Sequence, residues 1–196
     1  MFGTVRLALH ERWARGNVQV ILTNAPGVRT IFYKKTKRSG AMRTTKKIEE
    51  SLTEQQYLIC PAHINHYGRL FGGQLLKWID ELAGIVAMRH CGSTVTTAAI
   101  DNLQFRAPAY TGDMIVLRGW VTCVGKTSME VRVDTYREAL DGRREMINRA
   151  YIDMVAIDCK GRPKEVPAIE IETEEQRQEW EAAQKRRQMR KEHRQQ

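Results

Sequence analysis

The sequence predicts an α+β domain in which an antiparallel β-sheet of about five strands wraps around one long central helix. A mostly apolar stretch without proline, residues 74–90, is long enough to be that helix. Four segments rich in β-branched and aromatic residues follow it, each bounded by turn residues. The last three are joined by connections too short for a parallel crossover, so we expect them to form an antiparallel meander.

Residues 1–41 are predicted to be a basic N-terminal extension, disordered or not part of the native domain. They hold eight Lys and Arg against one acid, Glu11, so most of the net charge of +9 lies there and the body of the chain is nearly neutral. Three explanations stay open: an organellar transit peptide, a basic tail that adheres to acidic partners, or an upstream extension with Met42 as the working start. A nearly neutral body argues against a nucleic-acid-binding face.

The domain itself is expected to span residues 42–169. Its first strand is predicted at Gln55–Cys60, where Pro61 ends it. A glycine-containing loop, residues 62–73, leads from this strand into the central helix. Because the helix is apolar on most of its faces, other elements must enclose it, and the sheet is the expected enclosure.

The central helix carries two adjacent acids, Asp80 and Glu81. Burying a carboxylate costs several kcal/mol unless the group is paired or solvated, so at least one of them should face a partner, a cleft or an interface. The alternative is that both acids pair with Lys77 or Arg89 at helical spacing.

The remaining elements follow from composition and turn residues. Strands are predicted at four segments: Thr94–Phe105, Met114–Val124, Thr127–Leu140 and Glu145–Asp158. The last part of the chain, residues 170–196, is predicted to be a charged C-terminal helix. Thr173 and Gln176 fit a capping box at its start, and the helix is acidic early and basic late.

The loop before the helix and the helix itself carry a distinctive motif: Asn65-x-x-Gly68-x-x-Phe71-Gly72-Gly73, with Asp80 seven positions further on. A second motif, at the turn between two predicted strands, is Val124-Gly-Lys-Thr-Ser-Met-Glu130. Together with the charged tail, these motifs resemble the hotdog-fold acyl-CoA thioesterases of the cytosolic acyl-CoA hydrolase type, over about residues 48–190. The resemblance implies the hotdog fold and hydrolysis of acyl-CoA to a free carboxylic acid and CoA.

In that family the aspartate that matches Asp80 acts on the thioester carbonyl, as general base for water or as nucleophile, and the resemblance favours Asp80 over Glu81. The matching asparagine, Asn65, is implied to orient the water or the carbonyl. Gly72 and Gly73 add amides at a helix start, which can donate to a developing oxyanion. Two plainer explanations stay open: the glycines give the helix room to pack, and Asn65 bonds its own backbone in a turn.

The spacing of these residues predicts a shared site. Asp80 lies seven residues past Gly73, on the same helix face but ~10 Å further along the axis. Both cannot touch one carbonyl carbon, which requires contacts of ~3 Å. We therefore expect Asp80 of one subunit to meet Asn65 and Gly73 of another, which makes a homodimer the minimal active unit. The resemblance further implies a hexamer built as a trimer of dimers.

Coenzyme A needs cationic and backbone groups for its phosphates. Lys126, Thr127 and Ser128 follow a glycine at a strand turn, where amides, hydroxyls and one cation can hold a phosphate. An ordinary hairpin turn is the alternative explanation. Arg89 and Arg106 are weaker candidates for the same role.

We expect no cofactor beyond the CoA carried by the substrate, no metal site and no membrane span, since no apolar run approaches ~20 residues. The four widely spaced cysteines are typical of a reducing compartment and favour a cytoplasmic location, or an organellar one if residues 1–41 are a transit peptide. Two other functions remain open: a noncatalytic acyl-CoA-binding hotdog sensor, and a hotdog dehydratase or hydratase that uses His63 or His66.

Overall fold

The computed structural model describes residues 18–22, 31–35 and 43–193. The chain divides into two units, residues 1–42 and 43–196, and each is described by itself. In the first unit, β1 (Val18–Leu22) and β2 (Ile31–Lys35) form an antiparallel hairpin. The rest of the predicted basic extension lies outside the described residues, so the prediction that it is disordered stays a prediction.

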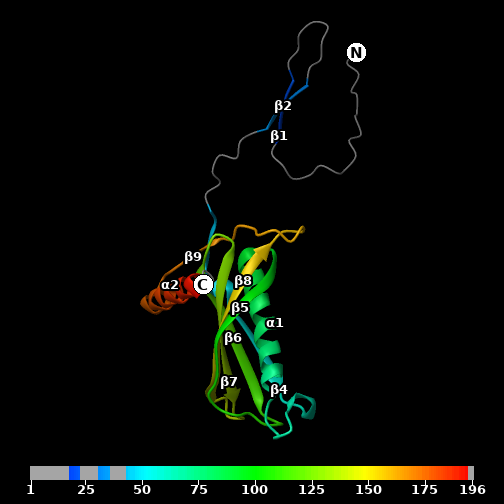
Figure 1. The fold of residues 1–196 in the computed structure, drawn as a ribbon, viewed down its shortest axis with the longest axis vertical. Helices are drawn as coiled ribbons and strands as arrows, with labels where there is room; N and C mark the ends of the chain where they lie inside the picture. The colour runs from blue at the N-terminus through cyan, green and yellow to red at the C-terminus, as the bar shows by residue number, and fades with distance from the viewer. Residues whose placement is uncertain (1–17, 23–30, 36–42, 194–196) are drawn as a thin grey trace. The chain divides into compact units, whose positions relative to one another are not determined.

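The second unit is built on a five-stranded antiparallel sheet in the order β4-β6-β7-β8-β5 (Figure 1). Its strands are β4 (Thr53–Leu58), β5 (Thr94–Phe105), β6 (Met114–Val124), β7 (Ser128–Glu138) and β8 (Arg144–Ile157). The helix α1 (Gly72–Cys91) packs along the inner face of this curved sheet. The predicted α+β hotdog architecture, including the meander β6-β7-β8, is confirmed.

Smaller elements complete the unit. A short parallel pair joins β3 (Thr45–Lys47) to β9 (Ala168–Glu170), and the 3₁₀ turns η1 (Ile48–Ser51) and η2 (Pro61–His63) flank β4. The C-terminal helix α2 spans Glu174–His193. In the described part of the chain, no helix combines the length and the apolar character needed to cross a membrane.

The helix α1 supplies the centre of the core. Leu75, Ile79, Leu82 and Val86 recur at helical spacing and are at most 1% exposed. Gly92 caps the end of the helix: it adopts the left-handed conformation (φ 58°), and its N–H donates to the carbonyl of Met88 at 2.8 Å. Enclosure of this helix by the sheet, predicted from its composition, is therefore observed.

The outer face of the sheet is held to α2 by ion pairs. On β7, Val131 and Val133 face the core, whereas Glu130 and Asp134 point to the opposite side and are nonetheless buried. Glu130 pairs with Arg186 of α2 at 2.8 Å, and Asp134 pairs with Arg132 at 2.7 Å. Charged groups buried this deeply depend on each other for solvation, and the pair between Glu130 and Arg186 joins α2 to the sheet.

Candidate active site

The loop before α1 is held in a tight, hydrogen-bonded turn. The side-chain Oδ1 of Asn65 accepts hydrogen bonds from the backbone N–H groups of Tyr67 (2.9 Å) and Arg69 (3.3 Å). The N–H of Asn65 donates to the Arg69 carbonyl at 2.8 Å, and Gly68 allows the turn through its positive φ of 73°. Asn65 is thus a turn residue, as one explanation proposed.

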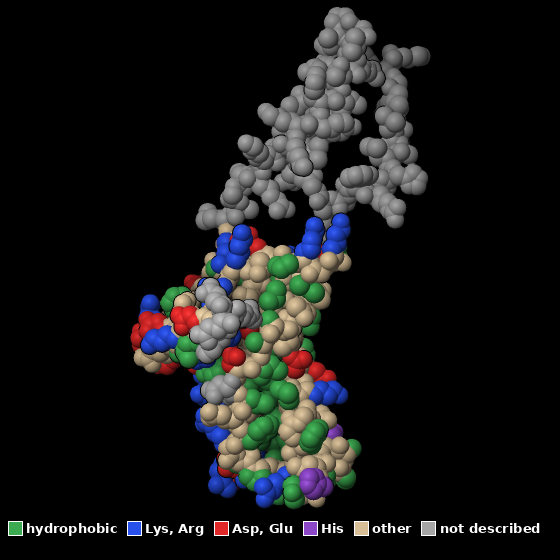
Figure 2. All heavy atoms as spheres, in the orientation of Figure 1, with side chains coloured by type: hydrophobic (Ala, Val, Ile, Leu, Met, Phe, Trp, Pro, Cys, Tyr) green, Lys and Arg blue, Asp and Glu red, His purple; other side chains and the backbone are tan. Residues whose placement is uncertain are grey.

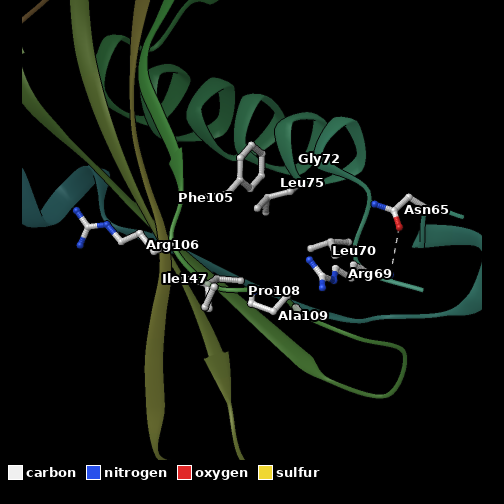
Figure 3. Close-up of a pocket in the computed structure, with 11 residues that line it drawn as sticks. Asn65, Arg69, Leu70, Gly72, Leu75, Phe105, Arg106, Pro108, Ala109 and Ile147 are labelled. Carbon is white, nitrogen blue, oxygen red and sulfur yellow. Dashed lines mark hydrogen bonds between the residues drawn. The ribbon is translucent and has the colours of Figure 1, made fainter. Parts of the chain in front are cut away.

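The turn uses only the oxygen of the Asn65 side-chain amide. The two backbone donors identify the oxygen of the amide, so the nitrogen Nδ2 faces the other way, toward the pocket in Figure 3. Among the described residues, Nδ2 meets no hydrogen-bond acceptor. The same side chain can therefore shape the loop and still donate to a water or a carbonyl.

The start of α1 offers further donors. Gln74 and Leu75 donate to the Phe71 carbonyl at 2.9 and 3.1 Å, while the N–H groups of Gly72 and Gly73 meet no acceptor within the described residues. A Cβ at Gly72 would lie 3.2 Å from the ring of Phe105, so this glycine also provides packing room. Packing room is therefore observed at Gly72, and the role of its amide as an oxyanion donor stays a prediction.

A pocket of about 370 Å³ lies between this loop, the start of α1 and the adjoining sheet (Figure 3). Its polar side chains are those of Asn65, Arg69 and Arg106, and no Asp or Glu lines it. Apolar groups make the remaining wall: Leu70, Leu75, Phe105, Ala107, Pro108, Ala109 and Ile147, with Gly72 at the helix start. The structure therefore brings Asn65 and Gly72 together, as predicted, around a mainly apolar cavity.

Asp80 lies elsewhere on α1. Its Oδ1 accepts a 2.6 Å hydrogen bond from the Thr97 hydroxyl on β5, and its side chain is half-buried. Glu81, by contrast, is exposed and pairs with Lys77 at 3.8 Å across one helical turn. The two adjacent acids thus have different environments: Glu81 is a surface ion-pair partner, and Asp80 is held by a neutral hydroxyl on the edge strand.

Within one subunit the pocket and Asp80 are separate. Asp80 does not line the pocket and lies about 12 Å along α1 from Gly72. Thr97, which the sequence analysis did not single out, is brought to Asp80 only by the way β5 runs beside the helix. The separation is the one that helix spacing predicts, and completion of the site by a second subunit stays a prediction.

The residues predicted to contact CoA lie far apart in the structure. The turn with Lys126, Thr127 and Ser128 lies at the far end of β6 from the pocket, about 35 Å along the strand. Its backbone closes an ordinary hairpin, with Gly125 donating to the Ser128 carbonyl at 2.7 Å. Arg89 bonds the Thr53 hydroxyl at 2.8 Å.

Of these CoA candidates only Arg106 lines the pocket, and in Figure 3 its guanidinium extends away from the cavity.

The contacts of His63 do not favour it as the catalytic histidine of a dehydratase. His63 accepts from the Cys60 N–H at 3.1 Å and sets its ring edge-on against Trp78. Within the described ranges, no cluster of three or more His, Cys, Asp or Glu side chains is arranged to hold a metal ion.

Comparison with known proteins identifies the family of this chain. The family model of the thioesterase superfamily matches residues 67–141. The chain is 38% identical over 133 residues to an uncharacterized acyl-CoA thioester hydrolase of Bacillus subtilis, which covers 67% of this chain and 77% of that protein. A solved hexameric acyl-CoA thioesterase superposes with a TM-score of 0.73 and 41% identity, over 76% of this chain and 97% of that one.

An acyl-CoA hydrolase of Staphylococcus aureus, solved with butyryl coenzyme A, coenzyme A and coenzyme A disulfide, has a TM-score of 0.73 and 33% identity, over 76% of this chain and 92% of that one. Its alanine variants replace one asparagine, one aspartate and one threonine, which are separated by 15 and then 17 positions. Asn65, Asp80 and Thr97 have the same separations. The chain therefore belongs to the family of hotdog-fold acyl-CoA thioesterases.

Proposed function

We propose that this protein hydrolyses acyl-CoA thioesters to a free carboxylic acid and CoA, with Asp80 and Asn65 as catalytic residues. The observation that carries the proposal is the placement of Asp80: a carboxylate without a cationic partner among the described residues, held on the central helix by Thr97. No cofactor is required, because CoA is part of the substrate.

The Thr97 hydroxyl occupies one carboxylate oxygen of Asp80 and leaves Oδ2 for the reaction. As general base, Oδ2 takes a proton from water while the water oxygen bonds to the thioester carbon; as nucleophile, it attacks that carbon itself. The carbonyl oxygen becomes an oxyanion in either case. The Gly72 and Gly73 amides, reinforced by the helix dipole, stabilise it, and Asn65 Nδ2 orients the water or the carbonyl. The C–S bond then breaks, and CoA leaves as a thiolate that takes up a proton, which on the general-base route comes from the protonated Asp80. On the nucleophilic route the acyl group stays on Asp80 as a mixed anhydride, and water then hydrolyses it to release the carboxylic acid and restore the Asp80 carboxylate.

The edge strand β5 supports a shared site. It pairs only with β8, so its other backbone edge is unpartnered within the described chain. If two copies pair antiparallel through β5 around a two-fold axis near Asp101, Thr97 of one lies opposite Phe105 of the other. Asp101 is midway between them, four residues from each. This arrangement sets the Asp80–Thr97 pair of each subunit against the pocket of its partner.

Surface character supports the same interface. Figure 2 shows hydrophobic side chains along the face on which α1 and β5 lie, and Tyr67, Phe71 and Phe105 are 75%, 55% and 55% exposed. We infer a homodimer as the minimal active unit and, with the hexameric relative as support, a trimer of such dimers.

An antiparallel dimer would also bring the turn between β6 and β7 near the pocket of the other subunit. It turns the partner's Lys126, Thr127 and Ser128 toward the end of the sheet that holds the pocket, where they can contact CoA phosphates. Arg89 and Arg106 remain secondary candidates for such contacts.

We also propose a cytoplasmic location, or an organellar one if residues 1–41 are a transit peptide. The free cysteines are compatible with either location: Cys60, Cys91, Cys123 and Cys159.

Thiol release from a panel of acyl-CoA thioesters of increasing chain length tests the function, with Asp80→Asn measured alongside. The amide keeps an acceptor for Thr97 but cannot take a proton, so turnover should fall by about 10²- to 10⁴-fold. Unchanged turnover in the variant would remove Asp80 from the mechanism. Hydration of an enoyl thioester, or acyl-CoA binding without turnover, would instead indicate the dehydratase or the sensor.

A further inference from the structure

Arg69 is a cation at the substrate pocket that the catalytic scheme does not use. Its backbone is fixed on both sides: its N–H donates to Asn65 Oδ1, its carbonyl accepts from the Asn65 N–H, and it bridges antiparallel to Tyr110. The side chain is exposed and lines the pocket together with Asn65 and Gly72. In Figure 3 its guanidinium lies on the pocket side of Leu70, whereas that of Arg106 extends away.

Within the described residues of one subunit, the charge of Arg69 has no counterpart in its surroundings. Among the described residues it forms no ion pair, and no acid lines the pocket. Most arginines of the outer sheet face differ in this respect: Arg132, for example, is bonded to Asp134. A guanidinium beside an apolar cavity with donors at one end suits a ligand that has an apolar body and an anionic group.

We propose that Arg69 binds an anionic oxygen group of the thioester substrate and so gives the pocket a preference for acyl groups that end in a carboxylate. The inference rests on the proposed thioesterase function and names a substrate class for it. A planar guanidinium can bind a carboxylate through two parallel hydrogen bonds, which a methyl-terminated acyl group cannot accept.

Size favours the acyl end as the source of this anion. The pocket volume of about 370 Å³ corresponds to a sphere about 9 Å across. In an extended CoA arm, about a dozen bonds separate the sulfur from the nearest phosphate, or about 15 Å. A carboxylate two to four bonds from the thioester carbonyl fits the same cavity as that carbonyl, and a phosphate on an extended arm does not.

The test compares succinyl-CoA with butyryl-CoA, which have four acyl carbons each and differ by a carboxylate in place of a methyl group. Relative to the unmodified protein, Arg69→Gln should lower the ratio of kcat/KM for succinyl-CoA to that for butyryl-CoA by about ten- to a hundredfold, with Arg69→Lys in between. The matched control is Arg143→Gln, which removes the same charge from an exposed arginine paired with Asp141 at the β7–β8 turn. This control should leave the ratio unchanged.

A further substrate identifies the source of the anion. If Arg69→Gln slows butyryl-CoA but not the butyryl thioester of N-acetylcysteamine, which has no phosphate, the anion is a CoA phosphate and the preference for carboxylate-ended acyl groups is overturned. If Arg69→Gln behaves like the control on all three substrates, the inference is wrong.

Binding of two thioethers separates this inference from the proposed function. S-(2-carboxyethyl)-CoA and S-propyl-CoA cannot be hydrolysed and differ by the same carboxylate, so Arg69→Gln should weaken only the first, by about tenfold or more. Loss of this difference with hydrolysis intact would overturn the role of Arg69 alone. A protein that binds the thioethers as expected but hydrolyses no thioester would overturn the proposed function alone.

Discussion

A mixing experiment tests the shared site most directly. Asp80→Ala and Asn65→Ala are purified separately, and each should be nearly inactive because every site in either homodimer lacks one catalytic group. In a heterodimer, one site takes Asn65 and Gly72 from the Asp80→Ala chain and the intact Asp80 from the Asn65→Ala chain, so that site is complete. The other site lacks both groups.

The recovered activity follows from counting sites. Random exchange of equal amounts of the two chains makes about half of the dimers heterodimers, and each holds one working site of two, so about a quarter of the unmodified activity should return. The value is the same within a hexamer, since each site needs only one pair of chains.

The assay is thiol release from butyryl-CoA before and after the two variants are incubated together at high concentration. Exchange is verified independently by giving the two chains different affinity tags and isolating complexes that carry both. Activity that stays at the level of the single variants, with exchange demonstrated, would refute the reasoning and place the complete site within one subunit.

Three further outcomes are expected. Thr97→Val should lower kcat by about ten- to a hundredfold, because the Asp80 carboxylate loses the hydroxyl that orients it. Thr97→Ser keeps a hydroxyl and should retain most of the rate. A Thr97→Val variant as active as the unmodified protein would contradict the role of Thr97 in orienting Asp80. Burial lowers the pKa of His90 below its ordinary value of about 6.5, so the unfolded chain takes up a proton that the folded chain does not, and stability should fall as the pH drops below about 6.5. His90→Gln should therefore lose less Tm than the unmodified protein between about pH 7.5 and about pH 5.5, and equal losses would count against this account. Asp134→Ala should cost about 3–5 kcal/mol of unfolding free energy, measured by denaturant titration, because Arg132 and Arg149 both lose the buried carboxylate that they share and Arg132 keeps only Glu179 among the described acids. A cost under about 1 kcal/mol would contradict this account.

Much of the fold could be predicted because turn residues bracket the strands. The segments Thr94–Phe105 and Met114–Val124 were delimited correctly, since Gly and Pro mark their ends. The central helix begins at Gly72, two residues before its predicted start, because a glycine pair is typical of a loop. The parallel pair β3–β9 was missed, since each strand has only three residues, too few to show a periodic pattern.

The site was less predictable because it depends on contacts between distant segments. Adjacent acids at positions 80 and 81 look alike in the sequence, and only the fold shows Glu81 with Lys77 and Asp80 with Thr97. Thr97 lies in a strand with several similar threonines, and the register of β5 beside α1 decides which of them reaches the helix. Spacing alone, however, did predict that Asp80 lies too far from Gly73 to share one carbonyl with it.

The position of β5 at the edge of the sheet has a consequence for how such an enzyme responds to dilution. One backbone edge of the strand has no partner in its own chain, and on the proposed dimer a second copy supplies both that partner and the missing half of each site. Dissociated subunits would keep their core, since α1 is enclosed by their own sheet, but would hold no complete site. Specific activity would then fall as the protein is diluted past the dissociation constant of the dimer, and would recover on concentration without any refolding.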